Sequence, residues 1–167
     1  MTPFDSPRLL ADIGGTYARF AIETAPGRFE HALSLRCAEH ADFHAAVSAY
    51  LAGLPAGAVG PIEHAAIAIA NPVEGDEVRM TNYHWQFSIE QMRQRLALLT
   101  LVVVNDFTAL AMALPRLSAA LLRQVGGGEP REHSVVGILG SGSGLGVSGL
   151  IPLADGTGGG GSGALTH

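Results

Sequence analysis

Lysine is absent from this sequence of 167 residues, and its ten basic residues are all arginines. Walker A phosphate loops and Schiff-base chemistry both require a lysine, so the sequence excludes these two classes of site. The formal net charge is -5, and no block of basic residues occurs. This charge pattern argues against nucleic acid and acidic membrane surfaces as partners.

Cysteine is nearly absent too, because Cys37 is the only one in the sequence. Neither a disulfide nor a cysteine zinc site can therefore form within one chain, and the histidines lack H-E-x-x-H or similar metal-binding spacing. The N-terminus lacks the charged-then-apolar layout of a signal peptide. No apolar run approaches the ~20 residues that span a bilayer, and we expect a cytoplasmic protein.

Hydrophobic residues make up 47% of the sequence, and they occur in strand-like and helix-like segments that alternate along the chain. Helices are predicted over residues 42–53, 88–98 and 107–114. Asp42 is the expected cap of the first helix, and Ser88 with Gln91 forms an expected capping box for the second. Strands are predicted over 8–14, 18–24, 28–37, 64–72 and 99–106, with a strand–turn–strand unit over 133–153.

The segment "LLADIGGTYARF", residues 9–20, places an acid and two glycines at the end of a predicted strand. In a strand–turn–strand arrangement Gly14 and Gly15 permit a tight hairpin whose backbone N–H groups face outward, and such groups form a concave site for phosphate. Thr16 adds a hydroxyl donor. Asp12 then lies near the phosphates, where it attracts their Mg²⁺ through water. A plain Gly-Gly hairpin with a surface acid remains the alternative.

A second glycine-rich turn, "GILGSGSGLGV" over residues 137–147, also follows a predicted strand. Two such hairpins in one chain suggest a clamp on the phosphates of a nucleotide. Residues 144–149 formally match the dinucleotide-binding fingerprint, but that fingerprint requires a following helix, which "LIPLADGTGGGG" does not predict. A flexible glycine loop remains the alternative. The candidate phosphate-binding residues of this turn are Gly140, Gly142, Ser143 and Gly144.

The segment "VVVNDFTAL" ends a buried strand with two polar residues, Asn105 and Asp106, directly before a predicted helix. Ligands bind at the carboxyl ends of internal strands in open α/β sheets. A carboxylate there can accept a hydroxyl proton as a general base, and an amide can both donate to and accept from sugar hydroxyls. The alternative is that Asp106 only caps a helix that begins at Phe107.

Four segments together resemble the bacterial glucokinase family, in the same order and with similar spacing along residues 8–152. They are "LLADIGGTYARFAIE", "AIAIANPVEGDEVRMTNYHWQFSIEQM", "VVVNDFTALAMALP" and "GILGSGSGLGV". The family comprises ATP-dependent sugar kinases with the actin-like, ribonuclease-H-like fold. The resemblance therefore implies an α/β lobe with a mixed sheet, β-hairpin phosphate loops and flanking helices. It also implies ATP and Mg²⁺ as cofactors, glucose or a related hexose as substrate, and a homodimer when the protein is full length.

The resemblance also assigns roles to individual residues. Asp106 matches the family's catalytic base, which takes the proton from the 6-hydroxyl of the sugar, and Asn105 matches a residue that binds sugar hydroxyls. Asn82 matches the sugar-side loop, and Trp85 is interpreted as a packing residue. The residues that match the two phosphate loops are Gly14, Gly15 and Thr16 in the first, and Gly140, Gly142, Ser143 and Gly144 in the second.

The sequence departs from the family pattern at several places. Tyr17 stands where the family usually has Asn, and its ring either points outward from the hairpin or crowds the phosphates; Ser143 replaces a usual Thr and keeps the hydroxyl. The family's Gly-Glu-Gly-Gly-His segment and its second, adenine-binding lobe do not follow. We therefore expect a truncated glucokinase, inactive by itself, with an N-terminal lobe over residues 1–152 and a glycine-rich tail, loop or linker over 153–167.

Three functions are compatible with these observations. The first is a glucokinase, which transfers the γ-phosphoryl group of ATP to the 6-hydroxyl of glucose at the entry to glycolysis. The second is a non-catalytic sugar-sensing or regulatory protein of the same fold. The third is a truncated product that serves mainly as an interaction or folding unit.

Overall fold

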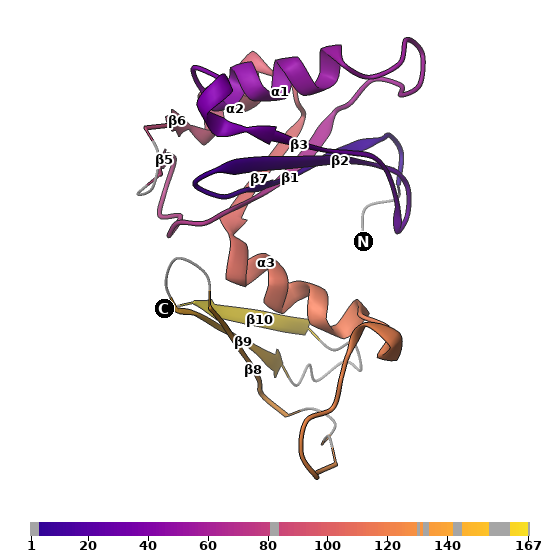
Figure 1. The fold of residues 1–167 in the computed structure, drawn as a ribbon, viewed down its shortest axis with the longest axis vertical. Coiled ribbons are helices and arrows are strands. Elements are labelled where there is room, and N and C mark those ends of the chain that lie inside the picture. The colour runs from indigo at the N-terminus through magenta and orange to yellow at the C-terminus, as the bar shows by residue number, and fades with distance from the viewer. Residues whose placement is uncertain are drawn as a thin grey trace. The chain divides into compact units, whose positions relative to one another are not determined.

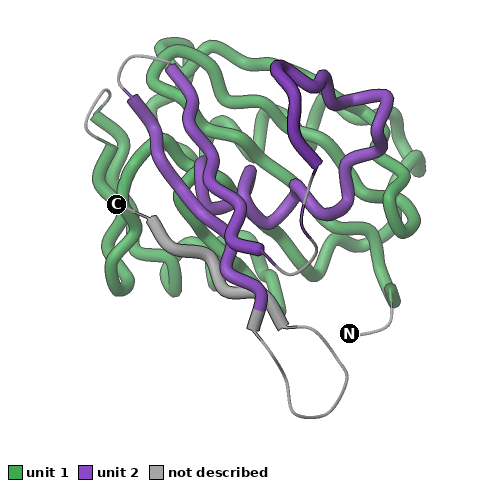
Figure 2. Tube along the Cα trace, turned by 90° about the horizontal axis from the view of Figure 1, so that it is seen from below, with its two compact units in different colours: residues 1–106 green, residues 107–167 purple. Residues whose placement is uncertain are grey.

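The structure is a computed structural model that describes residues 4–80, 84–129, 131, 134–141, 145–153 and 161–166. The chain divides into two compact units, Met1–Asp106 and Phe107–His167 (Figure 2). Each unit contains a β-sheet of its own. The predicted division into residues 1–152 and 153–167 stays a prediction.

The first unit is organised around a five-stranded mixed sheet with the strand order β3-β2-β1-β4-β7 (Figure 1). Strands β1, β2 and β3 form an antiparallel meander, and β4 and β7 run parallel to β1. This mixed sheet agrees with the fold class that the sequence predicts. The strands are β1 (Arg8–Ile13), β2 (Tyr17–Ala25), β3 (Arg28–Arg36), β4 (His64–Ile69) and β7 (Thr100–Asn105).

Helices α1 (Phe43–Ala52) and α2 (Ile89–Arg95) lie on one side of this sheet (Figure 1). Their N-terminal caps are those that the sequence predicts. The Asp42 carboxylate accepts a hydrogen bond from the backbone N–H of Ala45 at 2.7 Å, and the Ser88 hydroxyl accepts one from Gln91 N–H at 3.1 Å. Each cap satisfies a backbone donor that the first helical turn leaves without a partner.

The core lies between the sheet and these helices. Side chains on a strand alternate between its two faces, and alternate positions of β1, β2 and β4 are buried on the helix-covered face. Trp85 is buried there at 1% exposure and its ring lies 6.2 Å from that of Phe43, which confirms it as a packing residue. The other large side chains that are fully buried include Leu9, Ile13, Ile22, Phe43, Val47, Tyr50, Ile67, Ile69 and Val78.

The second unit contains most of helix α3 (Asp106–Ala113), which begins at the last residue of the first unit. A three-stranded antiparallel sheet follows, with the order β10-β9-β8. It consists of β8 (Val136–Ser141), β9 (Leu145–Leu153) and β10 (Gly161–Thr166). The described residues also include short 3₁₀ helices, η1 (Cys37–Glu39) in the first unit and η2 (Leu114–Arg116) and η3 (Ala119–Leu121) in the second.

Two features were not anticipated from the sequence. Residues 161–166, within the segment predicted to be a tail, loop or linker, pair with β9 as strand β10. Ladder hydrogen bonds use only backbone groups, so a glycine-rich segment with low strand propensity can still pair. The short hairpin of β5 (Glu77–Arg79) and β6 (Gln86–Ser88) was not predicted, because three residues are too few for a periodic pattern. Among the described residues, no helix is both long and apolar enough to cross a membrane.

Candidate functional site

The carboxyl ends of three strands meet at one edge of the first unit's sheet. In the parallel ladders Ile13 of β1 pairs with Ile69 of β4, and Ile69 pairs with Asn105 of β7. The N–H of Ala70 donates to the carbonyl of Ile13 at 3.0 Å, which continues the pairing by one residue. Neighbouring strands are about 4.8 Å apart, so the ends of β1 and β7 lie on the order of 10 Å from each other. The segments after these strands therefore emerge side by side.

The first glycine turn follows β1 and connects it to β2. The Gly14 N–H donates to the Tyr17 carbonyl at 3.0 Å, which closes the turn. The φ angle of Gly14 lies outside the left-handed region, and a Cβ there would meet only Tyr17 O, at an ordinary 3.6 Å. The fold itself does not require glycine at this position. Glycine also lets a ligand approach the backbone closely, because it has no side chain, and this is a separate reason for its presence. Gly14, Gly15 and Thr16 remain predicted phosphate-binding residues.

Cys37 lies under this turn and binds two of its carbonyl groups. Its N–H donates to Thr16 O at 3.0 Å, and its Sγ donates to Gly14 O at 3.6 Å. The side chain is fully buried, and this burial raises the pKa of the thiol, so the sulfur keeps the proton that it donates. Sequence reasoning missed this role. In an antiparallel pair the end of one strand lies beside the start of the other. The predicted pairing of residues 18–24 with 28–37 therefore placed Cys37 beside the first glycine turn, and this was the available signal.

Asp12 and Tyr17 lie on the exposed side of the turn. Arg19 Nη1 donates to Asp12 Oδ2 at 2.9 Å, between two side chains that are each more than half exposed. Tyr17 is 40% exposed and lies at the start of β2. Within the described ranges, no group of three or more His, Cys, Asp or Glu side chains is arranged to hold a metal ion. Asp12 can thus offer Mg²⁺ a single carboxylate, which suits an ion that keeps several waters and binds substrate phosphates.

Asn105 is anchored by a residue that the sequence did not single out. Its Nδ2 donates to the carbonyl of Asn71 at 3.1 Å, and Asn71 Nδ2 in turn donates to Arg79 O at 2.8 Å. Asn71 is only 5% exposed. This chain of hydrogen bonds fixes the end of β7 to the end of β4 and to strand β5. Asn71 lies near the carboxyl end of a predicted strand as Asn105 does, and this shared position was the signal that could have identified it.

Asp106 directly follows Asn105 and is the first residue of α3. Its side chain is half-buried. Its place in the first turn puts the carboxyl group at the positive end of the helix dipole. The geometry brings Asn105 and Asp106 to the same sheet edge as the first glycine turn, within one compact unit.

The segment that resembles the sugar-side loop is only partly described. Asn82 lies outside the described residues. Asp76, which precedes β5, organises the rest of the segment around the start of α2. Its carboxylate accepts from the Ser88 hydroxyl at 2.5 Å and from Glu90 N–H at 2.9 Å. These two hydrogen bonds lower the pKa of the Asp76 carboxyl below its usual value.

Replacing Asp76 by Asn tests this anchor through its pH dependence. Because the folded-state pKa is depressed, the carboxylate contributes stability above its unfolded pKa of about 3.9, and this contribution is lost as the pH falls through the folded value. We expect Asp76→Asn to unfold at lower urea concentration at pH 7, with the difference from wild type shrinking below about pH 4. Trp85, the only tryptophan, reports unfolding by fluorescence. A difference that is the same at pH 7 and pH 3 would contradict this role.

The second glycine turn belongs to the second unit. Gly140 and Ser141 end strand β8, whereas Gly142, Ser143 and Gly144 lie outside the described residues. Residues 145–153 form strand β9 and not a helix. The exclusion of a dinucleotide-binding fingerprint at this turn is therefore confirmed. The phosphate-binding assignment of these residues stays a prediction.

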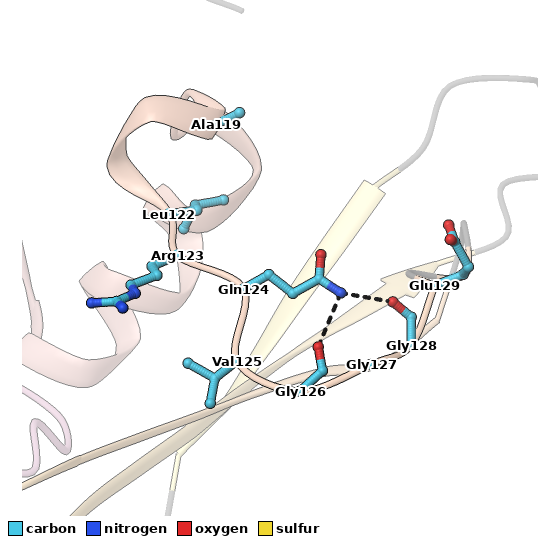
Figure 3. A pocket seen from close by; sticks show the side chains of 9 residues that line it. All are labelled: Ala119, Leu122, Arg123, Gln124, Val125, Gly126, Gly127, Gly128 and Glu129. Atoms are coloured by element: carbon cyan, nitrogen blue, oxygen red, sulfur yellow. Dashed lines mark hydrogen bonds between the residues drawn. The ribbon is translucent and has the colours of Figure 1, made fainter.

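Two surface hollows among the described residues lie away from the candidate residues. One of about 660 Å³ lies in the second unit along residues 119–129, where Gln124 Nε2 donates to the carbonyls of Gly126 and Gly128 (Figure 3). Another of about 260 Å³ includes Asp5 and His64, at the amino ends of the sheet strands. Neither is lined by a residue that the sequence assigns to catalysis, sugar or phosphate. The strand edge described above remains the candidate site.

Comparison with known proteins gives one family and a consistent set of relatives. The family model described as Glucokinase matches residues 9–161. The chain is 56% identical over 151 residues to the "Bifunctional protein glk" of Burkholderia pseudomallei, covering 90% of this chain and 23% of that protein. It is 55% identical over 150 residues to the glucokinase of Chromobacterium violaceum, covering 90% of this chain and 42% of that protein. The chain thus spans less than half the length of these relatives.

Solved structures show the same architecture. The glucokinase from an Antarctic psychrotroph matches with a TM-score of 0.83 and 31% identity, over 98% of this chain and 50% of that one. The ROK-family glucokinase from Streptomyces griseus, solved with glucose and AMPPNP, matches with a TM-score of 0.60 and 22% identity, over 87% of this chain and 44% of that one. These likenesses confirm the predicted fold class, the actin-like α/β fold of the glucokinases.

Proposed function

The chain belongs to the glucokinase family, and from this premise we propose that the protein transfers the γ-phosphoryl group of ATP to the 6-hydroxyl of glucose. The proposal extends to the whole protein, because the chain spans less than half of its glucokinase relatives. We further propose that the reaction takes place in the cytoplasm at the entry to glycolysis, and that the full-length protein is a homodimer.

The shared strand edge of the first unit carries this proposal. Gly14 follows β1 and Asn71 follows β4. Asn105 is the last residue of β7, and Asp106 is the first residue of α3. All four lie at the carboxyl ends of the parallel strands. The span of about 10 Å between the outer two strands leaves room for a phosphoryl group and the hydroxyl that attacks it. The arrangement supports a site at which a sugar on the β7 side meets a phosphate on the β1 side.

In the proposed reaction Asp106 accepts the proton of the 6-hydroxyl as that oxygen attacks the γ-phosphorus. Asn105 binds neighbouring sugar hydroxyls, because an amide can donate and accept at once. The hydrogen bond from Asn105 Nδ2 to Asn71 O restricts rotation of the amide before the sugar arrives. Asn82 is proposed as a further sugar contact. Fixing the hydroxyl beside the base supplies most of the protein's contribution, since phosphoryl transfer depends on positioning more than on covalent work.

The phosphates are proposed to bind backbone N–H groups of the two glycine turns. In the first turn, Cys37 engages the carbonyls of Gly14 and Thr16, and the Gly14 N–H closes the turn on the Tyr17 carbonyl. The proposed phosphate donors of this turn are therefore the N–H groups of Gly15 and Thr16 and the Thr16 hydroxyl, with Gly14 leaving the backbone open to close approach. Mg²⁺, when bound, would neutralise charge on the β- and γ-phosphates, and Asp12 would hold it through water. The proposed contacts of the second turn are Gly140, Gly142, Ser143 and Gly144.

A substrate panel tests the proposal. The full gene product is assayed with ATP and Mg²⁺ against glucose, mannose, fructose, a nucleoside and a protein substrate, and the ADP released with each is followed by a coupled assay. We expect glucose to be preferred and the nucleoside and protein to be inert. Mannose or fructose outcompeting glucose would overturn the specificity. Glucose binding without phosphorylation of any sugar would favour a sugar-sensing protein of the same fold.

A further inference from the structure

The ring of Phe107 lies against two glycines that face each other across the β8–β9 hairpin. Gly140 and Gly146 are direct partners in the antiparallel register. A Cβ built on Gly140 would lie 2.7 Å from the Phe107 Cζ, and one built on Gly146 would lie 2.0 Å from its Cε2. Carbon atoms in contact are ordinarily 3.5–4.0 Å apart. Even an alanine at either position therefore cannot coexist with the ring where it is.

The next pair on the same face of the hairpin is buried. Ile138 and Ser148, two pairs further along the ladder, are 8% and 4% exposed. Side chains two positions apart on a strand share a face. The Gly140–Gly146 pair is therefore a patch of backbone without side chains, next to the buried Ile138–Ser148 pair on the same face. The ring of Phe107 packs on this patch, and it fits there because Gly140 and Gly146 have no side chains.

Phe107 is also the direct neighbour of Asp106 in the chain, and both residues belong to helix α3. The hairpin it contacts leads into residues 142–144, which are proposed to bind phosphate. We infer that Phe107 is a positioning residue: by packing on the Gly140–Gly146 pair, it holds the second phosphate-binding hairpin on the helix that begins with the proposed catalytic base. This inference rests on the proposed function.

The consequence is a mechanical link between phosphate binding and the base. In-line transfer needs the phosphate turn and the base at a fixed separation, and a displacement of about 1 Å can cost about 10²-fold in rate. A methyl group forced between the ring and this patch must displace the hairpin, the ring or both. Ordinary core packing would predict a loss of stability alone, whereas a positioning role predicts weaker use of ATP with little change in the use of glucose.

A graded set of alanine variants tests the inference in the full gene product. Gly146→Ala should suffer most, Gly140→Ala less, and Gly137→Ala not at all, because Gly137 lies on the same strand as Gly140 and its added Cβ would meet nothing within 4 Å. We expect Gly146→Ala to lower kcat/KM for ATP by about 10- to 100-fold. The KM for glucose should stay within about twofold in all three variants.

The double variant Phe107→Ala with Gly146→Ala supplies the rescue. Removing the ring makes room for the methyl group, so the two substitutions together should cost less than the sum of their separate effects. Additive losses, or equal behaviour of Gly146→Ala and Gly137→Ala, would overturn the inference. So would a fall in thermal midpoint without a change in ATP affinity. If Gly146→Ala does not fold, Gly140→Ala takes its place in the cycle.

Two readouts separate this inference from the proposed function. The kinase assay shows whether the wild-type protein phosphorylates glucose. The dissociation constant for ATP, measured by calorimetric titration, shows whether the β8–β9 hairpin still binds the phosphates. A wild type that binds ATP but phosphorylates no hexose would refute the proposed function, while the ATP affinities of the same variants would still decide the role of Phe107. A wild type that binds no ATP would overturn both.

Discussion

Asp106→Asn is expected to lower kcat for glucose phosphorylation by about 10²–10⁴-fold, the usual contribution of a general base. The amide keeps the size of the side chain but cannot accept the hydroxyl proton. Asn has nearly the shape of Asp and fits the same half-buried position at the start of α3. Glucose should therefore still bind. The loss of a negative charge at the helix N-terminus should cost the folded state only about 0.3–1 kcal/mol.

The measurement pairs a coupled kinase assay with a glucose-binding titration on the full gene product. Asp5→Asn is the matched control, because it makes the same chemical change near His64, the first residue of β4, at the opposite end of the sheet strands. The control should keep wild-type kcat. Near-normal turnover in Asp106→Asn would reject the assignment of the base, and loss of glucose binding would show that Asp106 acts mainly in holding the sugar.

The strand ends that form the site could be predicted from the sequence because their signals are local. The buried run before Asn105 and Asp106 is long and apolar, and a polar pair that ends such a run is conspicuous. The caps at Asp42 and Ser88 are equally local, since both depend on residues within one helical turn. These elements were found where they were predicted, within one or two residues at most ends.

The supporting residues could not be predicted in the same way, because their roles depend on register between distant segments. Cys37 reaches Gly14 only because β3 returns beside β2. Asn71 reaches Asn105 across 34 positions of sequence. The glycine at 140 shows the limit most clearly: a glycine-rich turn indicates phosphate in the sequence, while the structure adds an aromatic ring that also requires glycine there. A glycine can be required because a ligand binds close to the backbone or because a neighbouring side chain packs there. The sequence alone does not distinguish these two reasons.

Residues 1–167 expressed alone are expected not to phosphorylate glucose at a measurable rate. The glucokinase of Chromobacterium violaceum and that of Aromatoleum aromaticum are each matched over less than half of their length, 42% and 45%. The resemblance to the family assigns adenine binding and further sugar contacts to the part beyond this match. Catalysis depends on holding both substrates in line, and effective molarities of order 10⁵ M or more are lost when one of them is not positioned.

The test follows glucose 6-phosphate formed by purified residues 1–167 with glucose, ATP and Mg²⁺, beside the full gene product. The buried Trp85 provides the folding control, since its fluorescence distinguishes an inactive folded chain from an unfolded one. Phosphate held at one sheet edge without a fixed adenine or a closed cleft leaves water free to compete with the sugar hydroxyl. Turnover within about tenfold of the ~10 s⁻¹ enzyme median would show that residues 1–167 complete the cleft themselves or through a second copy. The sequence-based expectation of an inactive fragment would then be wrong.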